Sequence, residues 1–215
     1  EIFSGSGRLS LTLLLSGLAV GPPIDMRYGW DVNNTSHQAM LLEAQREFKP
    51  GTIHYAPDCA PWSVSSSSKD PALRHQDRLH DLPALKFVQN SCEEQSREGR
   101  GYTVEQPYGS AMMDEGLRLD RIPDCKKKQR VDQCMHGAVS ELGDPVQKAT
   151  ALIGNIKYNK TALRCSGHQG QPHAHLQGQT GGHNRTTLAA VYPKQMCQRM
   201  RQDIIKYLHS RDLRS

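Results

Sequence analysis

The chain has 215 residues, of which 36% are hydrophobic and 23% are charged. This length and composition predict one globular domain or two small ones, and they exclude a disordered polyelectrolyte. Lysine and arginine outnumber aspartate and glutamate by 27 to 22, which gives a net charge of +5. A positive charge of this size permits nucleic acid as a partner but does not require it.

The longest uncharged run, residues 9–24, contains serine, threonine, glycine and two prolines. A bilayer span needs about 20 apolar residues, so we expect no membrane partner. The run also resembles the apolar core of a signal peptide, but residues 1–7 before it are typical of a strand that enters a glycine turn. The six cysteines are scattered without a tight framework, which favours reduced thiols and an intracellular setting.

Strand and helix patterns alternate along the first half of the chain. In chain order we expect a strand at 1–4, a helix over 9–18, a strand at 24–26, a helix over 36–48 with Ser36 as its N-cap, a strand at 52–56, a long helix that ends at Gly99, and a strand at 101–105. Such alternation is typical of βαβ units. The sequence therefore predicts an α/β fold, Rossmann-like, with a mainly parallel sheet flanked by helices.

The alternation stops after residue 120. The segments that follow are short, polar and rich in glycine and histidine, until Met196, Met200, Ile204 and Leu208 recur at four-residue spacing and predict a closing helix. We expect residues 1–120 to form the α/β core, and residues 121–215 to form an irregular C-terminal extension with short strands, a His/Gly-rich loop and that helix.

Glycines and an acid follow the first two expected strands. Gly5 and Gly7 come directly after the first strand, and Asp25 lies at the tip of the second. Glycine lets the backbone approach a ligand closely, and an acid at this position can accept both hydroxyls of a ribose. The pattern predicts a site for an adenosine-containing cofactor, although an ordinary strand–helix turn can contain the same glycines.

Two further side chains with chemical potential follow expected strands. Cys59 comes after the strand at 52–56, within PDCAPWS, and Glu105 ends the strand at 101–105, within VEQP. The carboxyl ends of strands are where α/β sheets place their reactive groups. Taken singly, Cys59 is better explained as a small buried residue and Glu105 as a surface carboxylate.

In this order, FSGSGRLS, Ile24-Asp25, PDCAPWS and VEQP resemble the motif series of class I S-adenosylmethionine-dependent methyltransferases. The resemblance is closest to DNA cytosine-5 methyltransferases and their relatives in eukaryotic mobile elements, and it covers about residues 1–110. Residues 189–204 resemble the closing segment that packs back on the cofactor face. The resemblance implies S-adenosyl-L-methionine as cofactor and nucleic acid as substrate, with cytosine C5 of DNA favoured over RNA. Residues 1–120 would then be the cofactor-binding and catalytic core.

The resemblance also implies roles for individual residues. The cofactor-binding residues would be Phe3, Ser4, Gly5, Gly7, Asp25 and Asp31, and the catalytic residues would be Cys59 and Glu105. Cytosine C5 is a poor nucleophile until a thiolate adds at C6, which is the role implied for Cys59. A carboxylic acid at ring nitrogen N3 stabilises that adduct, which is the role implied for Glu105. The target base has to leave the helical stack to reach such a site.

Three departures from the family pattern leave a second function open. The family's Pro-Pro-Cys is Pro57-Asp58-Cys59 here, and a neighbouring carboxylate should raise the pKa of the thiol. Glu-Asn-Val is replaced by Glu105-Gln106-Pro107, and the chain after it is short for a separate region that reads DNA. The alternative is a catalytically inactive methyltransferase-fold subunit that serves as a scaffold or binding module in a larger assembly.

The second half contains one group of residues with metal-binding chemistry. Cys165, His168, His173 and His175 lie close together in the sequence, and Cys125 and Cys134 lie upstream. Thiolates and imidazoles suit tetrahedral zinc. The spacing is not a standard one, and loops rich in glycine, glutamine and histidine are often solvated. We therefore expect no metal here and keep zinc as the alternative.

Overall fold

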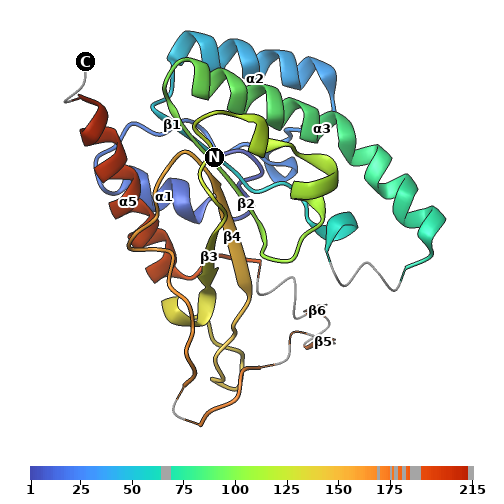
Figure 1. Cartoon of the computed structure of the whole chain (residues 1–215), viewed down its shortest axis with the longest axis vertical. Helices are drawn as coiled ribbons and strands as arrows, with labels where there is room; N and C mark the ends of the chain where they lie inside the picture. Colours follow the sequence, from blue (N-terminus) through green and yellow to red (C-terminus); the bar gives the residue numbers. More distant parts are fainter. Residues whose placement is uncertain are drawn as a thin grey trace.

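An open four-stranded sheet with helices on both faces forms the centre of the computed structural model (Figure 1). The structure describes residues 1–63, 69–168, 170–174, 176, 179–180, 183–184 and 190–212. The strands of the sheet are β1 (Thr52–Tyr55), β2 (Gly101–Pro107), β3 (Gln129–Asp132) and β4 (Ala149–Gly154), and the helices are α1 (Arg8–Leu14), α2 (Thr35–Phe48), α3 (Pro71–Arg97) and α5 (Lys194–Asp212). The short strands β5 (Gln179–Thr180) and β6 (His183–Asn184) pair only with each other in the part of the chain described.

The strand order is β1-β2-β4-β3, and the pairing is mixed. Strands β1 and β2 pair in parallel, whereas β4 is antiparallel to both of its neighbours. The α/β class is therefore confirmed, and the prediction of a mainly parallel sheet is wrong. The reason is that the chain after residue 120 returns with β4 between β2 and β3, a long-range pairing that the alternation of the first half does not reveal.

The expected strands at 1–4 and 24–26 are reduced to single bridges. Ile2 makes one parallel bridge to Ile24 and another to Tyr55 at the end of β1. Extended structure stops directly after Ile2, since Phe3 and Gly5 have φ angles of 58° and 54°, in the left-handed region. The second segment is equally short, because the 3-10 helix Met26–Tyr28, capped by Asp25, begins directly after it.

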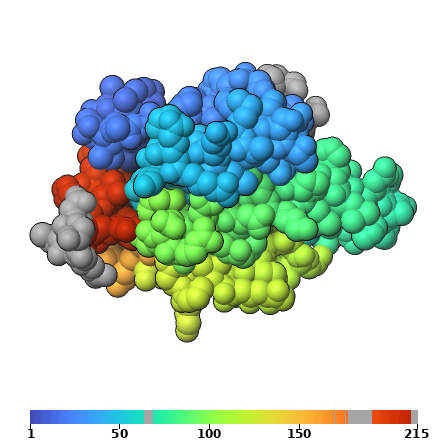
Figure 2. Space-filling model, turned by 90° about the horizontal axis from the view of Figure 1, so that it is seen from above, coloured from blue at the N-terminus to red at the C-terminus, as the bar shows by residue number. Residues whose placement is uncertain are grey.

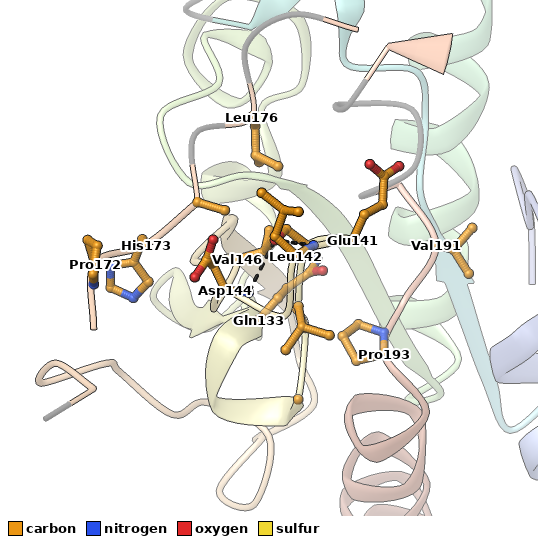
Figure 3. A pocket seen from close by; sticks show the side chains of 15 residues that line it. Gln133, Glu141, Leu142, Asp144, Val146, Pro172, His173, Leu176, Val191 and Pro193 are labelled. Atoms are coloured by element: carbon orange, nitrogen blue, oxygen red, sulfur yellow. Dashed lines mark hydrogen bonds between the residues drawn. The ribbon is translucent and has the colours of Figure 1, made fainter. Parts of the chain in front are cut away.

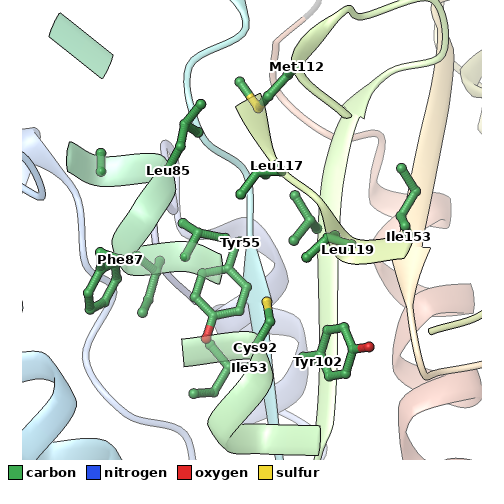
Figure 4. Close-up of a cluster of buried hydrophobic side chains, with 14 of the residues drawn as sticks. Ile53, Tyr55, Leu85, Phe87, Cys92, Tyr102, Met112, Leu117, Leu119 and Ile153 are labelled. Atoms are coloured by element: carbon green, nitrogen blue, oxygen red, sulfur yellow. The ribbon is translucent and has the colours of Figure 1, made fainter. Parts of the chain in front are cut away.

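Side chains alternate across the sheet and build one core on each face. On β4, Ala151 and Ile153 belong to the core beneath α3, while Leu152 belongs to the core beneath α1 and α5. This is the two-residue period of a strand buried on both sides. Figure 4 shows the first core, to which Leu85 and Phe87 of α3 and Tyr55 of β1 all belong.

Helices α2 and α3 lie side by side over one face, and the space-filling view from above shows them as one continuous surface (Figures 1 and 2). Helix α5 lies beside α1 over the other face. The N-cap of α2 lies two residues before the expected Ser36, because Oδ1 of Asn34 accepts from the amides of Ser36 and His37. Helix α1 ends at Leu14, four residues earlier than expected.

The segment after residue 120 is part of the same sheet. Strand β4 pairs with β2 from the first half, and α5 packs on α1. The boundary expected at residue 120 therefore does not coincide with a break in the sheet. In the described ranges, no helix combines the length and the apolar character that crossing a bilayer requires.

Candidate functional site

A cavity of about 740 Å³ lies where Ile2, β1 and β2 end, at the carboxyl edge of the parallel part of the sheet. Its volume is in the usual range for small-molecule sites, roughly 300–1,000 Å³. Seven of the eight cofactor-binding and catalytic residues expected from the sequence line it: Phe3, Ser4, Gly5, Asp25, Asp31, Cys59 and Glu105. The fold therefore brings together residues from four separate segments.

At one end of the cavity, the carboxylate of Asp25 is held by two backbone amides. The amide of Gly5 donates to Oδ2 at 2.8 Å, and the amide of Arg27 donates to Oδ1 at 3.1 Å. A Cβ atom built at Gly5 would meet no atom within 4 Å, so this position faces open space. Each carboxylate oxygen keeps a lone pair for a further donor.

Gly7 is the expected site residue that does not line the cavity. It precedes α1 with a φ of 62°, and its amide donates to the carbonyl of Ser4 at 2.9 Å. Its Cα faces Pro23 and Tyr28 instead of the cavity. Gly7 thus makes the turn into α1, and Gly5 is the glycine exposed to a ligand.

Two more polar groups lie at the Asp25 end. Oδ1 of Asp31 accepts from the amide of Asn33 at 2.9 Å, which fixes the orientation of that carboxylate. The hydroxyl of Ser4 is buried and has no hydrogen-bond partner in the described part of the chain. A buried polar atom without a partner is costly, so a ligand that bonds to Ser4 would relieve an existing penalty.

The loop that carries Cys59 is held at the other end of the cavity. The buried side chain of Gln106 donates from Nε2 to the carbonyl of Pro57 at 2.7 Å. Oδ1 of Asp58 accepts from the amide of Ala60 at 3.0 Å. Gln106 therefore positions the loop after β1 from the neighbouring strand β2, although it does not itself line the cavity.

The thiol of Cys59 is protonated in this environment at neutral pH. Burial raises its pKa to about 11, and the nearby Glu105 raises it further than Asp58 does, while Lys148 acts in the opposite direction. Asp58 raises the pKa of Cys59, as predicted from the sequence, but burial and Glu105 raise it more.

Glu105 itself is buried, and one of its carboxylate oxygens, Oε1, has no hydrogen-bond partner among the described residues. Burial raises the pKa of Glu105, and Lys148 and the hydroxyl of Tyr192 offset this only in part. A raised pKa favours the protonated acid, which can donate a proton or a hydrogen bond to a ligand.

The sequence did not single out three other residues of the cavity. Lys148 directly precedes β4, and because β4 is antiparallel its first residue lies at the same edge as the ends of β1 and β2. Tyr192 comes from the segment that resembles the family's closing segment, and Nη1 of Arg8 donates to its carbonyl at 2.6 Å. No sequence pattern predicted the antiparallel strand that places Lys148 at this edge.

A second cavity of about 540 Å³ lies between the residues after β3 and the chain around Val191. Figure 3 shows Pro172 and His173 at one side and Val191 and Pro193 at the other. Val191 also lines the first cavity, so the segment that carries it lies between the two.

The residues expected as an alternative zinc site lie beside this second cavity. The structure brings Cys165, His168 and His173 together with Cys134. His175 lies outside the described residues, and Cys125 belongs to the core beneath α3 instead. All six cysteines are described and are free thiols.

No protein-family model, curated protein or solved structure matches this chain.

Proposed function

We propose that the chain is an S-adenosylmethionine-dependent methyltransferase that acts on nucleic acid, with cytosine C5 in DNA as the favoured target. The observation that carries this proposal is the first cavity, in which Gly5 and Asp25 meet Cys59 and Glu105. Gly5 and Asp25 fit the binding of an adenosine cofactor, whereas Cys59 and Glu105 fit the covalent activation of a pyrimidine ring.

The sheet supports a Rossmann-like, methyltransferase-like arrangement once the two single bridges are included. The order then becomes Ile24, Ile2, β1, β2, β4, β3, and β4 alone runs against the others. After Ile2 the chain adds Ile24 on one side of it, and β1 then pairs on the opposite side of Ile2, followed by the remaining strands. Ligands of open α/β sheets bind at such a reversal, outside the carboxyl ends of the strands, and this is where the cavity lies.

The charges that line the cavity suit a cationic cofactor. Six carboxylates face three lysine and arginine side chains, namely Glu1, Asp25, Asp31, Asp58, Asp81 and Glu105 against Arg8, Arg27 and Lys148. S-adenosylmethionine is a sulfonium with net positive charge, and its chemical contribution is the transferable methyl group. Asp25 would hold the ribose hydroxyls, and the rings of Phe3 and Trp30 offer aromatic surface for the adenine.

Cys59 and Glu105 supply the groups that cytosine methylation needs from the protein. Glu105, once it has taken up a proton, would donate to ring nitrogen N3, which makes C6 more electrophilic. The thiol of Cys59 would lose its proton to solvent, and its sulfur would bond to C6. After C5 has gained the methyl group, the C5 proton would pass to solvent and the C6–S bond would break, which returns the thiolate of Cys59. The orphaned Oε1 of Glu105 has the capacity for that hydrogen bond.

One observation favours a second candidate, an inactive methyltransferase-fold subunit that binds its partners without catalysis. The pKa of Cys59 is raised to about 11, chiefly by burial, so the thiolate is scarce at neutral pH. If the chain is an active enzyme, the bound cofactor and substrate have to lower the pKa of Cys59, as a neighbouring positive charge does.

A trapping experiment distinguishes the two candidates. The chain is incubated with S-adenosylmethionine and a DNA duplex that contains 5-fluorocytosine, which cannot release its C5 substituent, and covalent complexes are counted on a denaturing gel. We expect a complex with wild type and with Cys125→Ser, a cysteine outside the cavity, and none with Cys59→Ser. A complex with wild type would refute the inactive subunit. The absence of any complex, with or without cofactor binding, would count against the active enzyme and favour the inactive subunit.

A further inference from the structure

Four side chains with metal-binding chemistry converge beside the edge strand β3. The ligand atoms of Cys134, Cys165, His168 and His173 all lie within 4.8 Å of one another. Sγ of Cys165 lies 3.3 Å from Nε2 of His168 and 3.4 Å from Nε2 of His173. Both imidazoles therefore point the same nitrogen at one thiol.

The four residues come from two separate parts of the chain. Cys134 is buried in the 3-10 helix Gln133–His136, directly after β3. The other three lie in the loop beyond β4, thirty or more residues later. A backbone hydrogen bond of 2.9 Å from the amide of Asp132 to the carbonyl of Leu163 brings the start of this loop back to the end of β3.

The loop is held in place before any metal is considered. Oδ2 of Asp132, the last residue of β3, accepts from the amide of Cys165 at 2.8 Å. Asp132 is itself buried and paired with Arg130, whose Nε lies 2.9 Å from its other oxygen. The cysteine at the start of the loop is thus positioned next to Cys134, and such preorganisation lowers the cost of assembling a site.

We propose that Cys134, Cys165, His168 and His173 form a structural zinc site. Two thiolates and two imidazoles are a standard donor set for Zn²⁺, and four protein ligands leave no open position for substrate. Bond lengths of about 2.3 Å to sulfur and about 2.0–2.1 Å to nitrogen place neighbouring ligands of a tetrahedron roughly 3.3–3.8 Å apart. The two sulfur–nitrogen distances of Cys165 match that spacing.

The proposed ligand set differs in one residue from the cluster that the sequence offered as an alternative. Cys165, His168 and His173 are shared, Cys134, already noted upstream, supplies the fourth ligand, and His175 lies outside the described residues. Binding involves no oxidation or reduction, because each of the two thiols releases its proton to solvent as its sulfur bonds to the metal.

The zinc would fasten the loop to the edge of the sheet and thereby fix two walls of the second cavity. Gln133, the neighbour of Cys134, lines one wall, and His173 with Pro172 lines another (Figure 3). The site is distinct from the cavity of Cys59, so it does not depend on the proposed methyltransferase activity.

The test begins with the full chain, purified in reducing buffer without chelator and analysed for metals by mass spectrometry. We expect one zinc per chain, and cobalt substitution should give the visible bands of a tetrahedral site with thiolate charge transfer. A chain that holds no zinc after incubation with zinc sulfate would overturn the proposal, and so would an octahedral cobalt spectrum.

Variants then identify the ligands. Cys134→Ser and Cys165→Ser should each weaken zinc binding by at least about 100-fold, since loss of outer-shell partners alone costs roughly 10–100-fold. Cys125→Ser and the exposed His75→Ala are the matched controls and should retain one zinc. Full affinity in Cys134→Ser would contradict the four-ligand assignment.

A rescue variant separates metal binding from misfolding. His173→Ala should lose zinc, whereas His173→Cys offers a third thiolate and should retain it, with stronger thiolate charge transfer in the cobalt spectrum. Loss of zinc in His173→Ala together with an unchanged cobalt spectrum in His173→Cys would show that His173 is not a ligand and would overturn the assignment.

Discussion

The amide of Gly5 donates a hydrogen bond of 2.8 Å to the carboxylate of Asp25, twenty residues further along the chain. The bond joins the glycine turn after Ile2 to the tip of the segment after Ile24, and both residues line the first cavity. The acid is therefore oriented by the same backbone that would contact a cofactor. This relationship makes the cofactor proposal testable at a single side chain.

Asp25→Ala should weaken the binding of S-adenosylmethionine by at least tenfold. The variant removes a charged acceptor for the ribose hydroxyls, and hydrogen bonds to charged groups contribute about 1.5–3 kcal/mol each. Equilibrium dialysis with labelled cofactor measures the change. Glu47→Ala, an exposed acid on α2, is the control and should bind as wild type does. Equal affinity in both variants would place the cofactor elsewhere.

Glu105→Gln should change two properties of the chain in opposite directions. The negative charge of Glu105 raises the pKa of Cys59, so its removal should increase the thiolate fraction and speed alkylation of Cys59 by iodoacetamide at pH 8. The same variant removes the acid at N3, so methylation should fall by roughly 10²–10⁴-fold. Peptide mass spectrometry and transfer of a tritiated methyl group give the two readouts.

Asp58→Asn is the matched variant for that experiment. It removes a smaller contribution to the pKa of Cys59 and keeps an oxygen that can accept from the amide of Ala60. Alkylation should speed up slightly, and methylation should rise rather than fall. A parallel decrease of both rates in Glu105→Gln would mean that the carboxyl only shapes the loop.

Gln106→Ala should reduce methylation while leaving cofactor affinity unchanged. Its amide holds the buried carbonyl of Pro57 on the Cys59 loop, and a buried acceptor left without a partner costs about 1–3 kcal/mol. Urea unfolding should therefore show a loss of stability of that size. Gln76→Ala, on the exposed face of α3, should lose neither stability nor activity. A loss of cofactor binding in Gln106→Ala would show that the loop also shapes the other end of the cavity.

His54 should make the stability of the fold depend on pH. Burial lowers its pKa from 6.5 to about 3, so between these values the unfolded chain binds more protons than the folded chain. The contribution of His54 is complete above pH 6.5 and is lost as the pH falls toward 3, at up to about 1.4 kcal/mol per unit. The variant His54→Gln cannot titrate. Its stability deficit relative to wild type in urea unfolding should shrink by roughly 2 kcal/mol between pH 6.5 and 5, and a constant deficit would contradict this account.

The cavity residues that could be predicted from the sequence are those that directly follow parallel strands or their bridges. Asp25, Cys59 and Glu105 were found because the carboxyl ends of such strands meet at one edge. Lys148 was missed because it precedes an antiparallel strand, and the place of β4 between β2 and β3 is set by pairing across more than forty residues. Local periodicity contains no information on such a pairing.

The proposed zinc ligands show the same limit of sequence-based prediction. The three ligands in one loop could be recognised from their spacing, but the fourth had to be chosen among residues that no local pattern distinguishes. Cys134 reaches the loop because β3 ends beside it and Asp132 holds the amide of Cys165. Sequence distance alone, which favours His175, does not reveal that approach.

The most direct test of the central claim is a calorimetric titration of the wild-type chain with S-adenosylmethionine. If Gly5, Asp25 and Cys59 line a cofactor site, the titration should show saturable binding of one molecule per chain, and bound cofactor should change the alkylation rate of Cys59, which lies in the same cavity. The absence of heat at millimolar cofactor, with an unchanged alkylation rate of Cys59, would contradict the account.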